Sequence, residues 1–211
     1  MNKTLNPDPE TLRSDPAYQL IKELEFQDIV PFVMEQIRKK TLFPVLYFTV
    51  NLGMLVFILI LSAKGLTDQS LAWKRLFIQA GTGILAGSIL VIPFHELLHG
   101  LAYRILGARK IIFGADLSQL IFYVTARPYT VSGMQIHLLT LAPFIIINLL
   151  TVITTVLIFQ DGLLFSAFFL LSHNIMCIGD FAISGYVNRT EGRVYTYDEP
   201  ERKMSYFYQK T

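Results

Sequence analysis

The sequence is short of charged residues and of cysteine. Charged side chains make up 16% of its 211 residues, against about 25% in an average soluble domain. Lys and Arg number 18 and Asp and Glu 16. So small a positive excess excludes a surface that follows nucleic-acid phosphates, and we expect no nucleic-acid partner. Cys177 is the single cysteine, which excludes an internal disulfide framework and a zinc site built from several cysteines.

Hydrophobic residues, by contrast, form 53% of the chain and gather in long uncharged segments. Four segments of 18 to 30 residues contain no Lys, Arg, Asp or Glu: Leu42–Ala63, Leu76–Phe94, Val131–Gln160 and Gly162–Gly179. About 20 apolar residues in a helix cross the hydrocarbon layer of a bilayer. Because lipid offers backbone groups no hydrogen-bond partner, each spanning segment must be helical. The sequence therefore predicts an all-α polytopic integral membrane protein with four transmembrane helices.

Lys and Arg are distributed unevenly around these four segments. Only Lys64, Lys74 and Arg75 fall in the connections expected outside, and the remaining 15 of 18 fall on the other side. Basic residues concentrate on the cytoplasmic side of membrane proteins. We therefore expect both termini, and the connection between the second and third spans, to be cytoplasmic.

The shorter parts of the chain predict two further elements. Residues 18–37 carry apolar side chains at mostly helical spacing, which is typical of an amphipathic helix lying on the membrane surface. The β-prone runs Lys110–Phe113 and Ile121–Ala126, separated by residues 114–119, predict a cytoplasmic β-hairpin between the second and third spans. The expected division is a cytoplasmic N-terminal arm, a four-helix membrane domain and a cytoplasmic tail: residues 1–41, 42–187 and 188–211.

Ionisable side chains within the apolar segments are few, and three stand together in the run His95-Glu96-Leu97-Leu98-His99. Two histidines four residues apart lie on one helical face, where both imidazoles can bind one zinc ion. Zinc lowers the pKa of a bound water to about 7, and a carboxylate beside the ion can take its proton. The pattern predicts His95 and His99 as zinc ligands and Glu96 as the catalytic base. The alternative is a metal-free hydrogen-bonded cluster near the membrane interface.

A catalytic zinc usually has a third protein ligand. His95 lies 9 residues before Arg104 and Asp180 lies 9 residues before Arg189, which places both about 13 Å from the first basic residue after their segments. His173 lies about 10 Å deeper than Asp180 along the same helix. The matched depth favours Asp180 as the third ligand. His173 stays open as an alternative ligand or a residue that lines the substrate path.

Asn148 is a polar residue in the middle of the third segment. An amide at such a depth contacts substrate or backbone inside the bundle, or it holds two helices together. The sequence does not separate these two roles.

The order of these features resembles a known family. A first span is followed by Phe94-His-Glu-Leu-Leu-His-Gly100, the hairpin, Leu141-Ala-Pro-Phe144 and Asn174-Ile-Met-Cys-Ile-Gly-Asp180. This arrangement, over residues 42–187, resembles small bacterial membrane proteins described as zincin peptidases and named as a domain of unknown function. It is more distantly similar to the site-2 proteases, which cut proteins within membranes.

The resemblance implies a metallopeptidase-like membrane domain in a bacterial plasma membrane. It implies zinc as the cofactor, His95, His99 and Asp180 as its ligands, and Glu96 as the base. Site-2 proteases carry the aspartate in an Asn-Pro-Asp-Gly setting, whereas this chain has Ile178-Gly179-Asp180-Phe181.

Together these features predict an intramembrane zinc metalloprotease that acts near the cytoplasmic face. Its expected partners are the lipid bilayer and a membrane-embedded or membrane-proximal protein substrate, and a homo-oligomer stays open. The rival hypothesis is a membrane protein that binds metal without proteolysis, either as a transporter or sensor or as a metal-stabilised scaffold.

Overall fold

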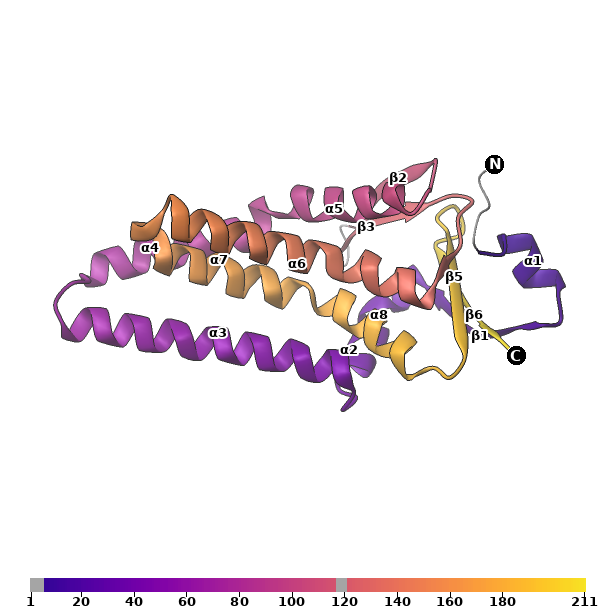
Figure 1. The fold of residues 1–211 in the computed structure, drawn as a ribbon, viewed down its shortest axis with the longest axis horizontal. Coiled ribbons are helices and arrows are strands. Elements are labelled where there is room, and N and C mark those ends of the chain that lie inside the picture. Colours follow the sequence, from indigo (N-terminus) through magenta and orange to yellow (C-terminus); the bar gives the residue numbers. More distant parts are fainter. Residues whose placement is uncertain (1–5, 117–120) are drawn as a thin grey trace.

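The computed structural model of the protein describes residues 6–116 and 121–211 (Figure 1). It is a long bundle of helices with strands and the helix α1 at one end. In chain order the elements are α1 (Pro9–Ser14), β1 (Tyr18–Glu25), α2 (Ile29–Ile37), α3 (Leu42–Thr67), α4 (Trp73–Leu85), the π-helical turn η2 (Ala86–Leu90), α5 (Ile92–Ile105), β2 (Ile111–Asp116), β3 (Ile121–Ala126), β4 (Val131–Ser132), α6 (Gly133–Leu157), α7 (Leu163–Met176), α8 (Ile178–Arg189), β5 (Arg193–Glu199) and β6 (Met204–Lys210). Short 3-10 turns precede α2 and α7, at Phe26–Asp28 and Gln160–Gly162.

Two of the described helices, α3 and α6, are each long and apolar enough to cross a membrane. Two helix pairs pass the same test only together. The pair Trp73–Leu90 and Ile92–Ile105 bends by 41°, and the pair Gln160–Met176 and Ile178–Arg189 bends by 48°. The described part of the chain thus has two to four candidate spans, as in a membrane protein. The four-span topology and the cytoplasmic termini stay predictions.

The first bend has a cause in the local sequence. Pro93 has no backbone N–H and its ring crowds the preceding turn, so it disfavours an unbroken helix at this point. It stands instead in the first turn of α5, where no amide hydrogen is needed. The π-helical turn η2 absorbs the change of direction just before it. The second bend falls at Cys177, between α7 and α8.

Two glycines bring the helix before the first bend close to α7. Gly83 and Gly87 are four residues apart on one face, a spacing that lets membrane helices approach closely. A Cβ added at Gly87 would lie 2.2 Å from the backbone oxygen of Phe169, and one at Gly83 would lie 2.7 Å from that of Phe165. The backbone of α7 therefore sits directly against this glycine face.

Four strands at the end of the bundle form an antiparallel sheet in the order β1-β6-β5-β4. These strands come from distant parts of the chain. Tyr18 of β1 pairs with Lys210 of β6, so the beginning and end of the chain share one sheet. The amphipathic helix predicted over residues 18–37 is therefore wrong in its first part, and only Ile29–Ile37 is helical. An all-α fold is likewise too simple, because the tail contributes β5 and β6.

The predicted hairpin is present as a separate two-stranded sheet, β2-β3. Its register runs from Ile111 opposite Ala126 to Asp116 opposite Ile121. Of the turn predicted between the strands, residues 117–119 lie outside the described residues. The division into arm, membrane domain and tail stays a prediction.

Candidate metal centre

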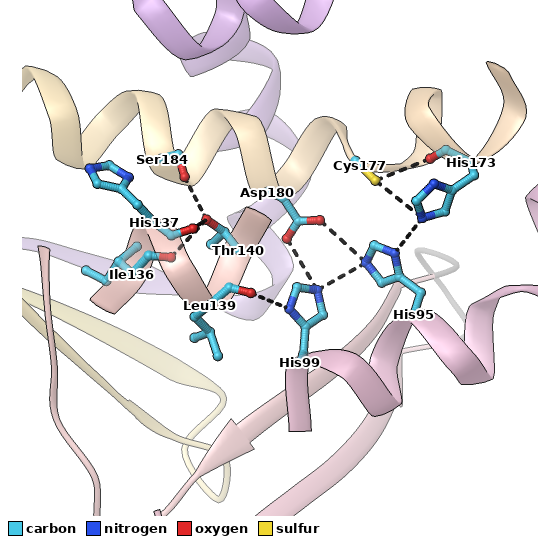
Figure 2. A network of polar contacts seen from close by, with 10 residues as sticks. All are labelled: His95, His99, Ile136, His137, Leu139, Thr140, His173, Cys177, Asp180 and Ser184. Atoms are coloured by element: carbon cyan, nitrogen blue, oxygen red, sulfur yellow. Dashed lines mark hydrogen bonds and ion pairs between the residues drawn. The ribbon is translucent and has the colours of Figure 1, made fainter. Parts of the chain in front are cut away.

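Three of the side chains singled out in the sequence converge between two helices (Figure 2). His95 and His99 project from α5, and Asp180 projects from the first turn of α8. The two imidazole Nε2 atoms are 3.1 Å apart. The Asp180 oxygens lie 3.4 Å from each of them, Oδ2 from His95 and Oδ1 from His99. The break at Cys177 is what turns α8 so that Asp180 reaches the histidines.

These separations fit a bound metal ion. Four ligands about 2.0 Å from zinc at tetrahedral angles are about 3.3 Å from one another, close to the three distances observed here. Two imidazoles and a carboxylate are also a ligand set that zinc accepts, with one position left for water or substrate. The residues present therefore fit the group that the HExxH pattern implies.

The hydrogen bonds behind the two histidines support the same conclusion. His99 Nδ1 lies 3.0 Å from the backbone oxygen of Leu139, to which it donates its hydrogen. In the neutral ring Nε2 then carries a lone pair. His95 Nδ1 lies 3.1 Å from Nε2 of His173, outside the three-ligand cluster. When His95 donates its Nδ1 hydrogen to His173, the lone pairs of both Nε2 atoms and a carboxylate face one another, and a cation satisfies all three.

His173 occupies a different place from the one that a third ligand of this cluster would take. It approaches the far nitrogen of His95, and its ring stacks on Phe169. Together with His95 and Cys177 it forms a second group of potential donors. His95 belongs to both groups but offers a different nitrogen to each. The ligand roles of Asp180 and His173 stay predictions.

Glu96 borders the same space as the three converging side chains. A cavity of about 500 Å³ is lined on one side by His95, Glu96, His99 and Asp180. No hydrogen bond or ion pair occupies the Glu96 carboxylate within residues 6–116 and 121–211, and Glu96 is half-buried. A carboxylate that is free and faces the cavity is available to accept a proton from a molecule bound there.

Much of the rest of the cavity lining was missed by the sequence analysis. It comes from α2, from β3 and from one face of the four-stranded sheet, whose contributing residues are Leu24, Thr196, Asp198, Ser205 and Phe207. The alternation of Val194, Thr196 and Asp198 in the tail could have indicated a strand with one inward face. It could not have indicated which cavity that face closes.

Asp198 is an acidic side chain in that sheet wall. Its carboxylate accepts a hydrogen bond from the Ser205 hydroxyl at 2.6 Å, and no Lys or Arg nitrogen of the described residues pairs with it. Burial raises the pKa of Asp198 to about 6, and the Ser205 hydrogen bond offsets this only in part. The sheet residues that line the cavity thus include a carboxyl group that no basic side chain of the described residues neutralises.

Asn148 takes the place of a residue that joins helices. Its amide donates to the Phe144 backbone at 2.8 Å and to the Asn174 side chain at 2.7 Å, and Asn174 donates back at 3.2 Å. It is not among the residues that line the cavity. This reciprocal pair connects α6 with α7, which favours the packing role over substrate contact.

One of the comparisons with known proteins identifies a family. No curated protein and no solved structure gives a significant match to the chain. A model of the family described as "Putative zincin peptidase" matches residues 88–195, just over half of the 211 residues. This range contains both histidines of the HExxH run, Glu96 and Asp180. The chain therefore belongs to the putative zincin peptidase family.

Proposed function

We propose that the protein is an intramembrane zinc metalloprotease that hydrolyses peptide bonds of membrane-embedded or membrane-proximal proteins near the cytoplasmic face. The observation that carries this proposal is the convergence of His95, His99 and Asp180 beside Glu96 on one cavity. The helices that supply these residues belong to the bent pairs that qualify as candidate spans. Membership of the zincin peptidase family supports the same chemistry.

Each residue has a separate task in this proposal. When bound, zinc would polarise the scissile carbonyl and acidify a water molecule. His95, His99 and Asp180 would hold it. Glu96 would accept the proton of the attacking water and deliver it to the leaving amine. The largely apolar cavity would keep other water away from the reacting groups, which strengthens their electrostatic interactions.

The substrate must present an extended backbone, because a peptide bond inside a helix is shielded by its own turn. The edge of β3 is suited to hold such a segment. Its residues Phe122–Thr125 are consecutive and all line the cavity. Side chains of a strand alternate between two faces, so four consecutive lining residues place the strand's edge at the cavity. An unwound substrate would add to this edge by backbone hydrogen bonds, which demand little side-chain specificity.

The test uses the purified protein in liposomes with a membrane-spanning model peptide whose helix is interrupted by Gly and Pro. Wild type should bind about one zinc per chain and cut the peptide. Glu96→Gln should keep the zinc and lose cleavage, because the amide cannot take a proton. Glu35→Gln, the same exchange at an exposed position of α2, is the matched control and should stay active.

Two outcomes would contradict the proposal. Full cleavage by Glu96→Gln would refute a zincin mechanism. Zinc binding without cleavage, combined with zinc flux across the vesicle membrane, would favour the rival transporter function.

A further inference from the structure

His173 is fully buried at the end of α7, and its contacts differ from those of an ordinary core histidine. Its Nε2 lies 3.1 Å from Nδ1 of His95 (Figure 2). Its other nitrogen, Nδ1, is buried and has no hydrogen-bond partner among the residues that the structure describes. Nε2 thus faces the ring of His95, and the Cys177 sulfur lies 3.7 Å from the same nitrogen.

We propose that His173 is a positioning residue that orients His95 for the metal, and this inference rests on the metal site of the proposed function. For His95 to bind a metal through Nε2, its neutral ring must carry the hydrogen on Nδ1. That hydrogen needs an acceptor because His95 is buried. Nε2 of His173 is the acceptor within reach. The hydrogen of the neutral His173 ring then lies on Nδ1, which has no partner among the described residues, and metal binding by His95 has to offset that cost.

The arrangement is parallel to the one behind the second ligand. His99 donates its Nδ1 hydrogen to the Leu139 backbone oxygen at 3.0 Å, so each histidine of the HExxH run has one nitrogen towards the cluster and one held from behind. Such supporting hydrogen bonds fix the ring orientation and the tautomer of metal-binding histidines, and their loss typically weakens metal binding 10- to 100-fold. Behind His95, the acceptor is the imidazole of His173, where a carboxylate or backbone oxygen is more common.

The alternative for the same atoms is a second metal site made by His95, His173 and Cys177. Occupying both sites at once would require His95 to lose both ring hydrogens and bridge two ions. The Cys177 sulfur also lies 3.3 Å from the backbone oxygen of His173, as a thiol donor does. These two features favour a hydrogen bond between the histidines over a second ion.

The experiment measures the zinc dissociation constant of detergent-purified protein by competition with a chromophoric chelator. His173→Gln keeps an acceptor, because a glutamine oxygen can take the place of Nε2, whereas His173→Leu removes it. Zinc binding should weaken about 10- to 100-fold in His173→Leu and by only a few-fold in His173→Gln. Ser166→Ala, which removes another buried polar group of α7 that bonds Thr155 at 2.7 Å, is the matched control and should leave zinc affinity unchanged.

A second readout separates positioning from general damage to the fold. The visible spectrum of the cobalt-substituted protein should change in His173→Leu and return towards wild type in His173→Gln. The thermal unfolding temperatures of the metal-free proteins should not rank the three proteins as zinc affinity does, with His173→Leu lowest and His173→Gln near wild type. A variant that binds zinc weakly only because it is poorly folded would fail this comparison.

The inference is overturned if His173→Leu binds zinc like wild type, or if His173→Gln is as weak as His173→Leu. Two zinc ions per wild-type chain would establish the second site instead. Wild type that binds zinc normally but cleaves no peptide would refute the proposed function and leave the affinity test of His173 intact. Wild type that binds no zinc would overturn both.

Discussion

Gly87 offers the sharpest test of how the helices are held together at the site. A Cβ added there would lie 2.2 Å from the backbone oxygen and 2.9 Å from the backbone carbon of Phe169. Both atoms belong to the backbone of α7, so no side-chain rotation can relieve the overlap. The helices must separate by about 1 Å to restore an ordinary contact distance.

The expected cost follows from the packing of the interior. Overpacking of a close-packed core costs about 1–3 kcal/mol, and at Gly87 this outweighs the gain of about 0.5–1 kcal/mol for replacing a helical glycine by alanine. The matched control is Gly81→Ala on the same helix, where no atom lies within 4 Å of the added Cβ. Gly81→Ala should therefore be neutral or slightly stabilising. Because both variants share the gain from replacing glycine, their stabilities should differ by about 1–3 kcal/mol.

The assay is reversible unfolding in mixed micelles with increasing dodecyl sulfate, followed by circular dichroism. Gly87→Ala should unfold at a lower dodecyl sulfate fraction than wild type and Gly81→Ala. Since the glycine face holds the helix that leads into α5, zinc affinity should also fall in Gly87→Ala. If Gly87→Ala were as stable as Gly81→Ala, the close approach of η2 to α7 would be refuted.

Three further predictions concern the cavity. Asp180→Ala should reduce bound zinc from about one per chain to near zero, whereas Asn148→Ala, which removes a polar group outside the cavity, should keep it; retention in Asp180→Ala would contradict the ligand role. The pKa of Asp198 is about 6 in the folded protein and 3.8 ordinarily, so the native state binds this proton more tightly than the unfolded state. The free energy of unfolding should therefore fall by up to about 3 kcal/mol as pH rises from about 4 to 6. Asp198→Asn should flatten that dependence in unfolding titrations, and an unchanged slope would contradict it. Deleting Ile121–Ala126 removes the backbone of the β3 edge and should slow model-peptide cleavage about tenfold through the loss of one or two net hydrogen bonds with zinc still bound; equal cleavage would exclude the added strand.

Local signals in the sequence were sufficient for several elements. Uncharged runs are long enough to indicate α3 and α6 without any knowledge of packing. The hairpin β2-β3 joins neighbouring segments, so its two β-prone runs predict it. The spacing of His95 and His99 needs only the pitch of one helix.

The N-terminal strand shows where such signals fail. Residues 18–25 alternate imperfectly and fit a helix or a strand about equally well. What decides is the partner, since β1 pairs with β6 across almost the whole chain, Tyr18 with Lys210. The conformation of residues 18–25 is set by this distant pairing and not by local propensity. The backbone hydrogen bonds and side-chain contacts that stabilise β1 come from β6, which a pattern within residues 18–25 cannot indicate.

The sequence by itself determined that the chain has membrane-length apolar helices and one HExxH run, because composition and helical spacing are local properties. Only the tertiary structure decided what surrounds that run. The bend at Cys177 carries Asp180 to the two histidines, the contact with His173 depends on the meeting of α5 and α7, and the sheet places Asp198 in the cavity lining. Each of these contacts joins residues far apart in the chain, and their distances are set by how the helices and the sheet pack.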